Sequence, residues 1–291
     1  MVKFRNYAKV ISSVDLNNLC SRFSVAILVT VTALGMTSCD ARHYDDETLV
    51  ALHERLVELE SRLAVQEDIE AIRKLQYTYN YYNQSGYSKQ LLSLVSENAE
   101  SIEIGGRGVY LGKDGFRRAF ASYAEDGEIR DRVKSFGDVL FQIASMDVIN
   151  VAADRESATC RLIVLTPIFR GFPENPQQKM NAGVYEMKYV REEGQWLISK
   201  FKYVHVFSVG WGENGELVPG YSTAPNGEAD GPTTWYHPWP ESGALPFSYP
   251  NPVTGEYPPD NTNPTRYWIG NWSEEEFGKT GIRPDTEWRN E

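Results

Sequence analysis

The order of the secondary-structure signals constrains this chain more than any other feature. Helical patterns occupy the first part, and segments rich in β-branched and aromatic residues follow them. The strand candidates are 100–104, 135–151, 157–169, 181–193 and 195–207, with REEGQW as a hairpin turn between the last two. Helices followed by strands are typical of an α+β fold, so we expect helices packed on an antiparallel sheet.

Leucines recur three and four residues apart at the start of the predicted helical region. They are Leu49, Leu52, Leu56, Leu59 and Leu63. This spacing places them on one helix face, as in a coiled coil, but the pattern lasts only about two heptads. A subunit contact and packing on the chain's own domain both remain open for this seam. Since the seam and the aromatic C-terminal region both offer apolar surface, we expect a homo-oligomer.

The same helix continues into a tyrosine-rich stretch, IRKLQYTYNYYNQSGY (72–87). One stripe collects Ile69, Ile72, Gln76, Tyr79 and Asn83, and Tyr82 lies one turn beyond Tyr79. A tyrosine can fill a core, or it can donate a hydrogen bond in a pocket, because a phenol keeps its proton at neutral pH. Both interpretations remain open for Tyr79 and Tyr82.

The N-terminal segment has the pattern of an export signal. Lysines and arginines precede an uncharged apolar run, 23–36, which is short for a membrane span of about 20 residues. The following MTSC resembles a bacterial lipobox, which implies cleavage before Cys39 and lipidation of that residue. We expect 1–38 to be an export signal, with the chain exported to the periplasm or anchored in a membrane by lipid. An uncleaved anchor is the alternative, and 39–54 is expected to be a linker and the start of the helix.

Composition excludes several kinds of function. A net charge of −11 with no basic stripe argues against nucleic-acid binding. Cleavage removes Cys20 and lipidation uses Cys39, so Cys160 is expected to be alone and no disulfide is predicted. The four histidines and three cysteines show no metal-ligand spacing, so we expect no metal site.

Residues 208–291 differ from the rest of the chain. Twelve of the fifteen prolines and six of the seven tryptophans lie there. Proline excludes regular helix and central strand, and the aromatic content is too high for ordinary disorder. We expect an irregular C-terminal arm that packs its rings onto a sheet of its own subunit or of a neighbour.

The stretch from LESRLAVQEDIEAIRKLQYTY to GKDGFRRAFASY, together with NAGVYEMKYVREEGQWLISKF, resembles SnoaL-like domains of the NTF2-like superfamily. The resemblance covers about 55–207. It implies a cone in which helices close one end of a curved antiparallel sheet around a pocket. Enzymes of this superfamily include scytalone dehydratase, polyketide cyclase and ketosteroid isomerase types, most of which need no cofactor, while other members only bind ligands.

The resemblance also implies candidate site residues. Scytalone-type dehydratases place a substrate-binding Asn before a Tyr at the spacing of Asn181 and Tyr185. Their catalytic His corresponds to Lys134 of KSFG, so that acid–base pair is not carried over. Lys134 serves as a base only if desolvation lowers its pKa, and a surface lysine is the alternative.

His205 and Glu103 complete the candidates. His205 is the only histidine in a core strand pattern, and its pKa range suits proton transfer. Glu103 lies near the position where several relatives of this superfamily place an acidic base. A structural histidine and a solvent-facing glutamate are the alternatives.

We therefore expect an exported, cofactor-independent lyase, dehydratase or isomerase. It would act by general acid–base chemistry on an aromatic or polycyclic small molecule, with Tyr79, His205, Glu103 and Lys134 as catalytic candidates. Asn181, Tyr82 and Tyr185 are the substrate-binding candidates. The alternative is a non-catalytic ligand-binding or scaffold lipoprotein.

Overall fold

The structure is a computed structural model, and it describes 45–105, 107–121, 131, 135–211, 217–219, 229–231, 233–234, 245, 247–258 and 267–268. The predictions for the export signal 1–38, for Cys39 and for Lys134 lie outside the described residues. Within these residues, no helix has a stretch long and apolar enough to cross a membrane.

Three described helices precede or interrupt the first strands: α2 (Asp46–Ser85), α3 (Ser88–Leu92) and α4 (Gly112–Ala121). The strands are β1 (Ser101–Ile104), β2 (Gly108–Leu111), β3 (Val139–Leu140), β4 (Ile143–Val151), β5 (Ser157–Arg170), β6 (Gln177–Glu192), β7 (Gln195–Trp211), β8 (Leu217–Pro219), β9 (Thr233–Thr234) and β10 (Tyr267–Trp268). The predicted segment 135–151 is thus two strands, and the last two predicted strands are longer than expected.

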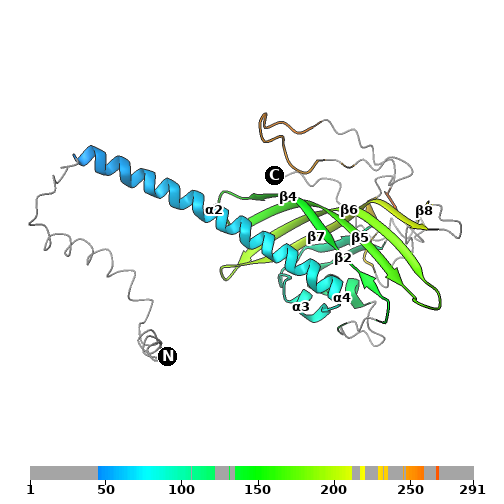
Figure 1. Ribbon diagram of the computed structural model, residues 1–291. Coiled ribbons are helices and arrows are strands. Elements are labelled where there is room, and N and C mark those ends of the chain that lie inside the picture. Colours follow the sequence, from blue (N-terminus) through cyan, green and yellow to red (C-terminus); the bar gives the residue numbers. More distant parts are fainter. Residues whose placement is uncertain are drawn as a thin grey trace, which may run out of the picture. The chain divides into compact units, whose positions relative to one another are not determined.

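One sheet carries the fold, in the order β2-β1-β7-β6-β5-β3, with β4 also paired to β5 and β8 to β7. The described pairings in this sheet are antiparallel except for β1, which runs parallel to β7. The C-terminal half of α2 lies across one face of this sheet (Figure 1). The α+β prediction with helices on a mostly antiparallel sheet is confirmed.

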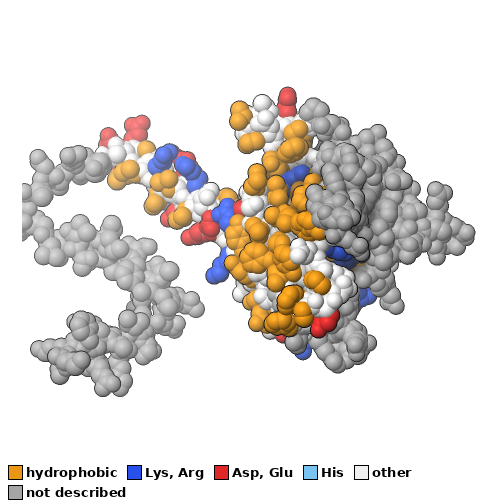
Figure 2. All heavy atoms as spheres, turned by 45° about the vertical axis from the view of Figure 1, so that its right-hand side comes forward, with side chains coloured by type: hydrophobic (Ala, Val, Ile, Leu, Met, Phe, Trp, Pro, Cys, Tyr) orange, Lys and Arg blue, Asp and Glu red, His pale blue; other side chains and the backbone are white. Residues whose placement is uncertain are grey.

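The two halves of α2 differ in their surroundings. Ile72, Gln76 and Tyr79 on the predicted stripe are buried, and Ile72 and Tyr79 join the core formed with β1, β5, β6 and β7. The earlier leucines, from Leu49 to Leu63, are 46–59% exposed. Hydrophobic side chains also cover much of the sheet surface seen in Figure 2. The exposed hydrophobic residues of β3, β4, β5 and the β3–β4 connection include Val139, Phe141, Ile143, Ile163 and Phe169.

A β-bulge fixes the middle of α2 to β4. The register of β4 against β5 shifts between Ser145 and Val148, and Met146 has a positive φ of 58°. The displaced Asp147 accepts hydrogen bonds from Arg73 Nε (2.9 Å) and from the Tyr77 hydroxyl (3.1 Å). Tyr77 is therefore a hydrogen-bonding contact between helix and sheet, and not packing alone.

Asp68 fixes the same helix at a second point. Its carboxylate is buried and accepts hydrogen bonds from Arg155 Nε (2.5 Å), Arg191 Nη1 (3.2 Å) and Trp196 Nε1 (3.1 Å). Burial opposes the charged form, but the hydrogen bonds from Arg155 and Trp196 and the two positive charges outweigh it and lower the pKa of Asp68. The helix is thereby tied to the β4–β5 turn, to β6 and to β7.

The described parts of the C-terminal region contact the sheet. Asp230 accepts hydrogen bonds from the backbone N–H of Leu111 (2.7 Å) and from Arg118 Nη2 (2.6 Å) beside edge strand β2. Ser248 donates to Glu186 Oε2 (2.7 Å), and the guanidinium of Arg161 lies 5.1 Å from the centroid of the Phe247 ring. These contacts cover the edge strand and the outer sheet face, opposite α2.

Replacing Asp68 by Asn should destabilise the fold. The change keeps the shape and removes the charge that holds two guanidiniums, so the free energy of unfolding should fall by about 3 kcal/mol at pH 7. Because the folded-state pKa of Asp68 lies below the unfolded value near 4, this contribution is present above about pH 4 and is lost as the pH falls further. The difference between Asp68→Asn and the unchanged protein should therefore shrink in urea titrations at about pH 3.

Glu67→Gln is the matched control, because Glu67 is the exposed neighbour of Asp68. Its free energy of unfolding should stay within about 0.5 kcal/mol of that of the unchanged protein. An equally small effect for Asp68→Asn at pH 7 would contradict the anchoring role.

Candidate functional site

A cavity of about 310 Å³ lies between the C-terminal part of α2 and the inner face of the sheet. Its described lining comes from α2, α4, the β1–β2 turn, β3, β5, β6 and β7. This volume is at the lower end of the range for small-molecule sites. The long β5–β6 hairpin extends the concave face beyond the core, which leaves the space open.

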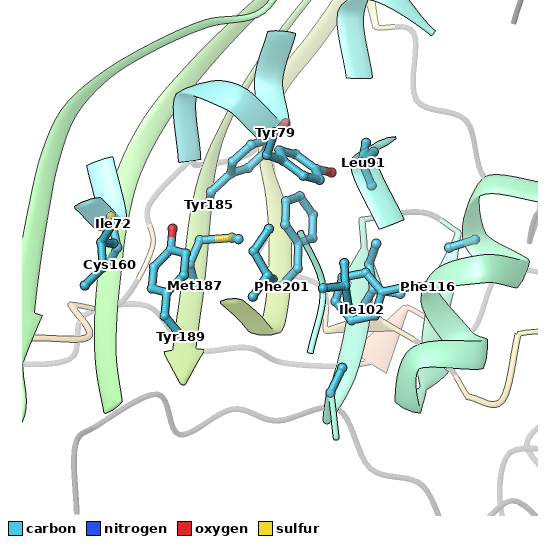
Figure 3. Packing of buried hydrophobic residues seen from close by; sticks show 14 of the residues in the cluster. Ile72, Tyr79, Leu91, Ile102, Phe116, Cys160, Tyr185, Met187, Tyr189 and Phe201 are labelled. Carbon is cyan, nitrogen blue, oxygen red and sulfur yellow. The ribbon is translucent and has the colours of Figure 1, made fainter. Parts of the chain in front are cut away.

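Aromatic rings form one wall of the cavity. Phe201 lies 5.3 Å from Tyr79 and 4.7 Å from Tyr185, measured between ring centroids. Tyr203 continues the row at 5.2 Å from Tyr185 in an edge-on arrangement, and His205 follows at 4.6 Å from Tyr203. Figure 3 shows Tyr79 reaching from α2 toward Tyr185 and Phe201 on the sheet. The wall offers an apolar surface with polar groups at fixed positions along it.

Two glycines make room for the end of this wall. A Cβ atom on Gly183 would lie 2.2 Å from the ring of Tyr203 and 2.4 Å from the carbonyl oxygen of Val204. A Cβ atom on Gly105 would lie 2.7 Å from the ring of His205. All three distances are shorter than any normal contact, so these side chains hold their positions only beside glycine.

His205 is held in one tautomer. Its Nε2 lies 3.1 Å from the carbonyl oxygen of Gly105, which can only accept, so Nε2 carries the proton and Nδ1 carries the lone pair. The pKa of His205 is lowered to about 4, mainly by burial and in part by the charge of Arg107, while the hydrogen bond to Gly105 opposes the shift. The imidazole is therefore neutral at pH 7.

Tyr203 provides a second polar group. Its hydroxyl is buried and has no hydrogen-bond partner within the part of the chain that the structure describes. Burial raises the pKa of Tyr203, so the phenol keeps its proton. Buried donors without a partner are uncommon in folded proteins.

Amide groups complete the polar lining. Asn83 donates to Gln142 Oε1 (3.1 Å), and Gln142 Nε2 donates to the Tyr185 hydroxyl (2.9 Å), which links α2, the β3–β4 connection and β6. Asn181 Oδ1 accepts from the Ser208 hydroxyl (2.7 Å), so the amide NH₂ of Asn181 is the end that can donate to a ligand.

The charged lining is entirely cationic in the described residues. Arg107, Arg170 and Lys179 line the cavity, and no Asp or Glu does. The described residues also contain no group of three or more His, Cys, Asp or Glu side chains that could hold a metal ion.

Comparison with known families shows which family the region around the cavity resembles. The model of the SnoaL-like domain matches 64–202. Residues 64–202 form a SnoaL-like domain. This match agrees with the SnoaL-like resemblance of the sequence. No curated protein sequence matches the chain.

Solved structures are also similar to the chain. A candidate scytalone dehydratase from Novosphingobium aromaticivorans is 18% identical over 59% of this chain and 99% of its own, with a TM-score of 0.42. Hexachlorocyclohexane dehydrochlorinase LinA-type3 from Novosphingobium barchaimii is 18% identical over 55% and 98%, with a TM-score of 0.40. An NTF2-like protein with a cystatin-like fold from N. aromaticivorans is 18% identical over 56% and 92%, with a TM-score of 0.35.

Four of the residues expected from the sequence lie on the cavity of the SnoaL-like domain: Tyr79, Asn181, Tyr185 and His205. They come from α2, β6 and β7, which the fold brings together. Their chemical roles stay predictions.

The prediction of Glu103 as a catalytic residue in the pocket needs correction, because Glu103 does not line the cavity. It points to the opposite face of the sheet, where it is buried and its carboxylate lies 3.3 Å from Lys202 Nζ. Lys202 lies opposite Glu186 on the neighbouring strand, and Glu186 pairs with Arg161 at 2.9 Å. Glu103 thus ends a row of alternating charges on the outer face, and it is neither a base in the cavity nor a solvent-facing residue.

The prediction of Tyr82 as a substrate-binding residue also needs correction. Its ring packs edge-on against Tyr87 at 6.3 Å, and it is absent from the cavity lining. Three residues rotate a helix by about 300° and four by about 400°, so Asn83 continues the stripe of Tyr79 while Tyr82 turns away from it. Lys134 lies outside the described residues, and the prediction for it stays open.

Sequence reasoning missed several residues of the cavity lining: Tyr203, Gln142 and the cations Arg107, Arg170 and Lys179. Tyr203 had a usable signal, because it alternates with His205 on one strand face. Gln142 and the cations gave none, since nothing in their local sequence distinguishes them from surface residues.

Gly183→Ala should disturb the wall. The new methyl group overlaps both the ring of Tyr203 and backbone, so the ring must move or the strands must separate. We expect a loss of about 1–3 kcal/mol in the free energy of unfolding, as for other overpacked sites.

The control is Gly194→Ala in the β6–β7 turn, where a Cβ atom meets nothing within 4 Å. That glycine has a φ of 79°, so its cost, about 1 kcal/mol, comes from backbone strain alone and should leave the cavity unchanged. Near-UV circular dichroism should therefore change for Gly183→Ala and not for Gly194→Ala. An unchanged aromatic spectrum for Gly183→Ala would contradict the packing described.

Proposed function

We propose that the SnoaL-like domain is a cofactor-independent enzyme, a lyase, dehydratase or isomerase, that acts on an oxygenated aromatic or alicyclic small molecule. The observation that carries the proposal is the pair at the end of the aromatic wall. It consists of a neutral His205 with its proton fixed on Nε2, and the buried hydroxyl of Tyr203 beside it.

In this proposal Nδ1 of His205 is the general base. It takes a proton from a carbon next to a carbonyl group of the substrate, and the electron pair of the broken C–H bond moves toward the carbonyl oxygen. The Tyr203 hydroxyl and the Asn181 amide donate hydrogen bonds to that oxygen as its negative charge develops. Donors fixed in advance in an enclosed site lower the barrier by a few kcal/mol each.

Because the pKa of His205 is low, the imidazole does not keep the abstracted proton. A protonated imidazole in this position is a strong acid, because burial and Arg107 both disfavour its charge. It therefore gives the proton up promptly. In an elimination the proton goes to the leaving hydroxyl, which departs as water while the electron pair forms a C=C bond. In an isomerisation the proton returns to another carbon of the same substrate.

Membership of the SnoaL-like family is compatible with this class of reaction. Two of the similar structures carry the names of a candidate dehydratase and a dehydrochlorinase, which are elimination enzymes by name, but the likeness to them shows the fold alone. The alternative is a domain that binds a ligand without converting it, which the apolar wall would also allow.

His205→Gln and Tyr203→Phe test the proposal, with Tyr82→Phe as the control outside the cavity. After a substrate is found among hydroxylated aromatic ketones, His205→Gln should lower kcat by at least about 100-fold and Tyr203→Phe by at least about 10-fold. Tyr82→Phe should change neither kcat nor KM by more than about twofold. Titration of His205 should not change kcat between pH 5 and 8. Near pH 4, kcat should fall because Nδ1 becomes protonated.

Two results decide between the alternatives. If His205→Gln keeps full turnover, the proposed base is wrong. If ligands bind and Tyr203→Phe weakens them, but no compound in the panel is converted, the binding alternative is favoured.

A further inference from the structure

The three cations of the cavity come from separate parts of the chain. Arg107 lies in the turn between β1 and β2, Arg170 ends β5, and Lys179 lies near the start of β6. In the β5–β6 ladder, Lys179 is paired with Ile168. Ile168 precedes Arg170 by two residues on β5, so its side chain points to the same face as that of Arg170. The two side chains are therefore diagonal neighbours on the same sheet face, roughly 7 Å apart at Cβ.

The described part of the chain supplies no carboxylate to balance these cations. Within the described residues, none of the three is paired with a carboxylate, and no Asp or Glu lines the cavity. This arrangement stands out in a chain with a net charge of −11, where 40 acidic residues face 29 basic ones. Arg107 is half-buried, as are Arg73, Arg118 and Arg155, which contact carboxylates. Arg170 and Lys179 are exposed at the open end of the cavity lining.

We propose that the cavity binds a small aromatic or alicyclic substrate that carries an anionic oxygen group, such as a carboxylate. The anionic group lies between Arg170 and Lys179, and the ring lies against the wall of Tyr79, Phe201 and Tyr185. This inference rests on the proposed function and names the substrate class of that site.

The lining supports both halves of such a ligand. Guanidinium groups bind carboxylates through two parallel hydrogen bonds, and an ammonium group adds a point charge that tolerates several geometries. At the inner end, Tyr203 and Asn181 can donate to a carbonyl or hydroxyl oxygen, which also requires an oxygenated ring. A volume of about 310 Å³ restricts the ring system to a small one.

Calorimetric binding to the full chain at pH 7 tests the proposal with three probes of the same ring: 2-naphthoate, naphthalene-2-sulfonate and 2-naphthol. The two anions should bind at least tenfold more tightly than 2-naphthol. Their advantage should decrease as the salt concentration rises from about 0.02 to 0.5 M, because screening weakens exposed charge interactions.

The double variant Arg170→Gln with Lys179→Gln should remove the preference for the anions and leave the affinity for 2-naphthol within about twofold. Lys89→Gln is the matched control, since Lys89 is an exposed cation on α3 outside the cavity lining. It should keep the full preference. Both variants change exposed side chains, and the salt dependence of the unchanged protein gives a second reading that needs no variant.

Equal or tighter binding of 2-naphthol overturns the inference, and so does the absence of naphthoate binding at about millimolar concentration. These failures are distinct from failure of the proposed function. Preference for the anions without turnover of any compound would contradict the enzyme alone. Turnover of neutral substrates only would contradict the anion site alone.

Discussion

The carboxylate of Asp68 lies where α2, the β4–β5 turn, the end of β6 and the start of β7 meet, and it accepts hydrogen bonds from the last three. Buried carboxylates are costly unless they are fully paired, and this one is. Together with Asp147, which holds Arg73 and Tyr77, it sets the position of the helix on the sheet. The helix in turn places Tyr79 and Asn83 over the concave face, so the cavity depends on this anchor.

The charged residues on the two faces of the sheet differ in whether they pair with one another. On the outer face, Glu186 and Glu103 alternate with Arg161 and Lys202, and the row is covered in part by Ser248 and Phe247. On the inner face the cations have no such partners in the described chain. In our proposal the carboxylates stabilise the scaffold, and the positive charge and neutral imidazole of the inner face serve the ligand.

Much of the architecture could be predicted from the sequence because it follows from local periodicity. The stripe of Ile72, Gln76 and Tyr79 identified the buried face of α2, and β-branched alternation located β5, β6 and β7 closely. The same alternation put His205 on a core strand. These features need only the residue spacing of a helix or strand.

The parts that could not be predicted depend on tertiary contacts. Strand alternation puts Glu103 and Ile102 on opposite faces, but it cannot show that the face of Glu103 is covered or that Lys202 pairs with Glu103. The bulge within β4, between Ser145 and Val148, has no recognisable signal in the sequence around Met146. Arg107 lies more than 60 residues before Arg170 and Lys179 in the sequence, and only the folded sheet brings all three to one cavity.

The central claim is that His205 is a neutral base with its proton on Nε2. Nitrogen-15 NMR of the full chain labelled at histidine measures this directly, with the signals of His205 assigned by their absence in His205→Gln. We predict a neutral imidazole that is protonated at Nε2 and unprotonated at Nδ1, with no titration between pH 8 and 5 because the pKa is about 4. A proton on Nδ1, or a titration near pH 6.5 as in an exposed histidine, would contradict this claim.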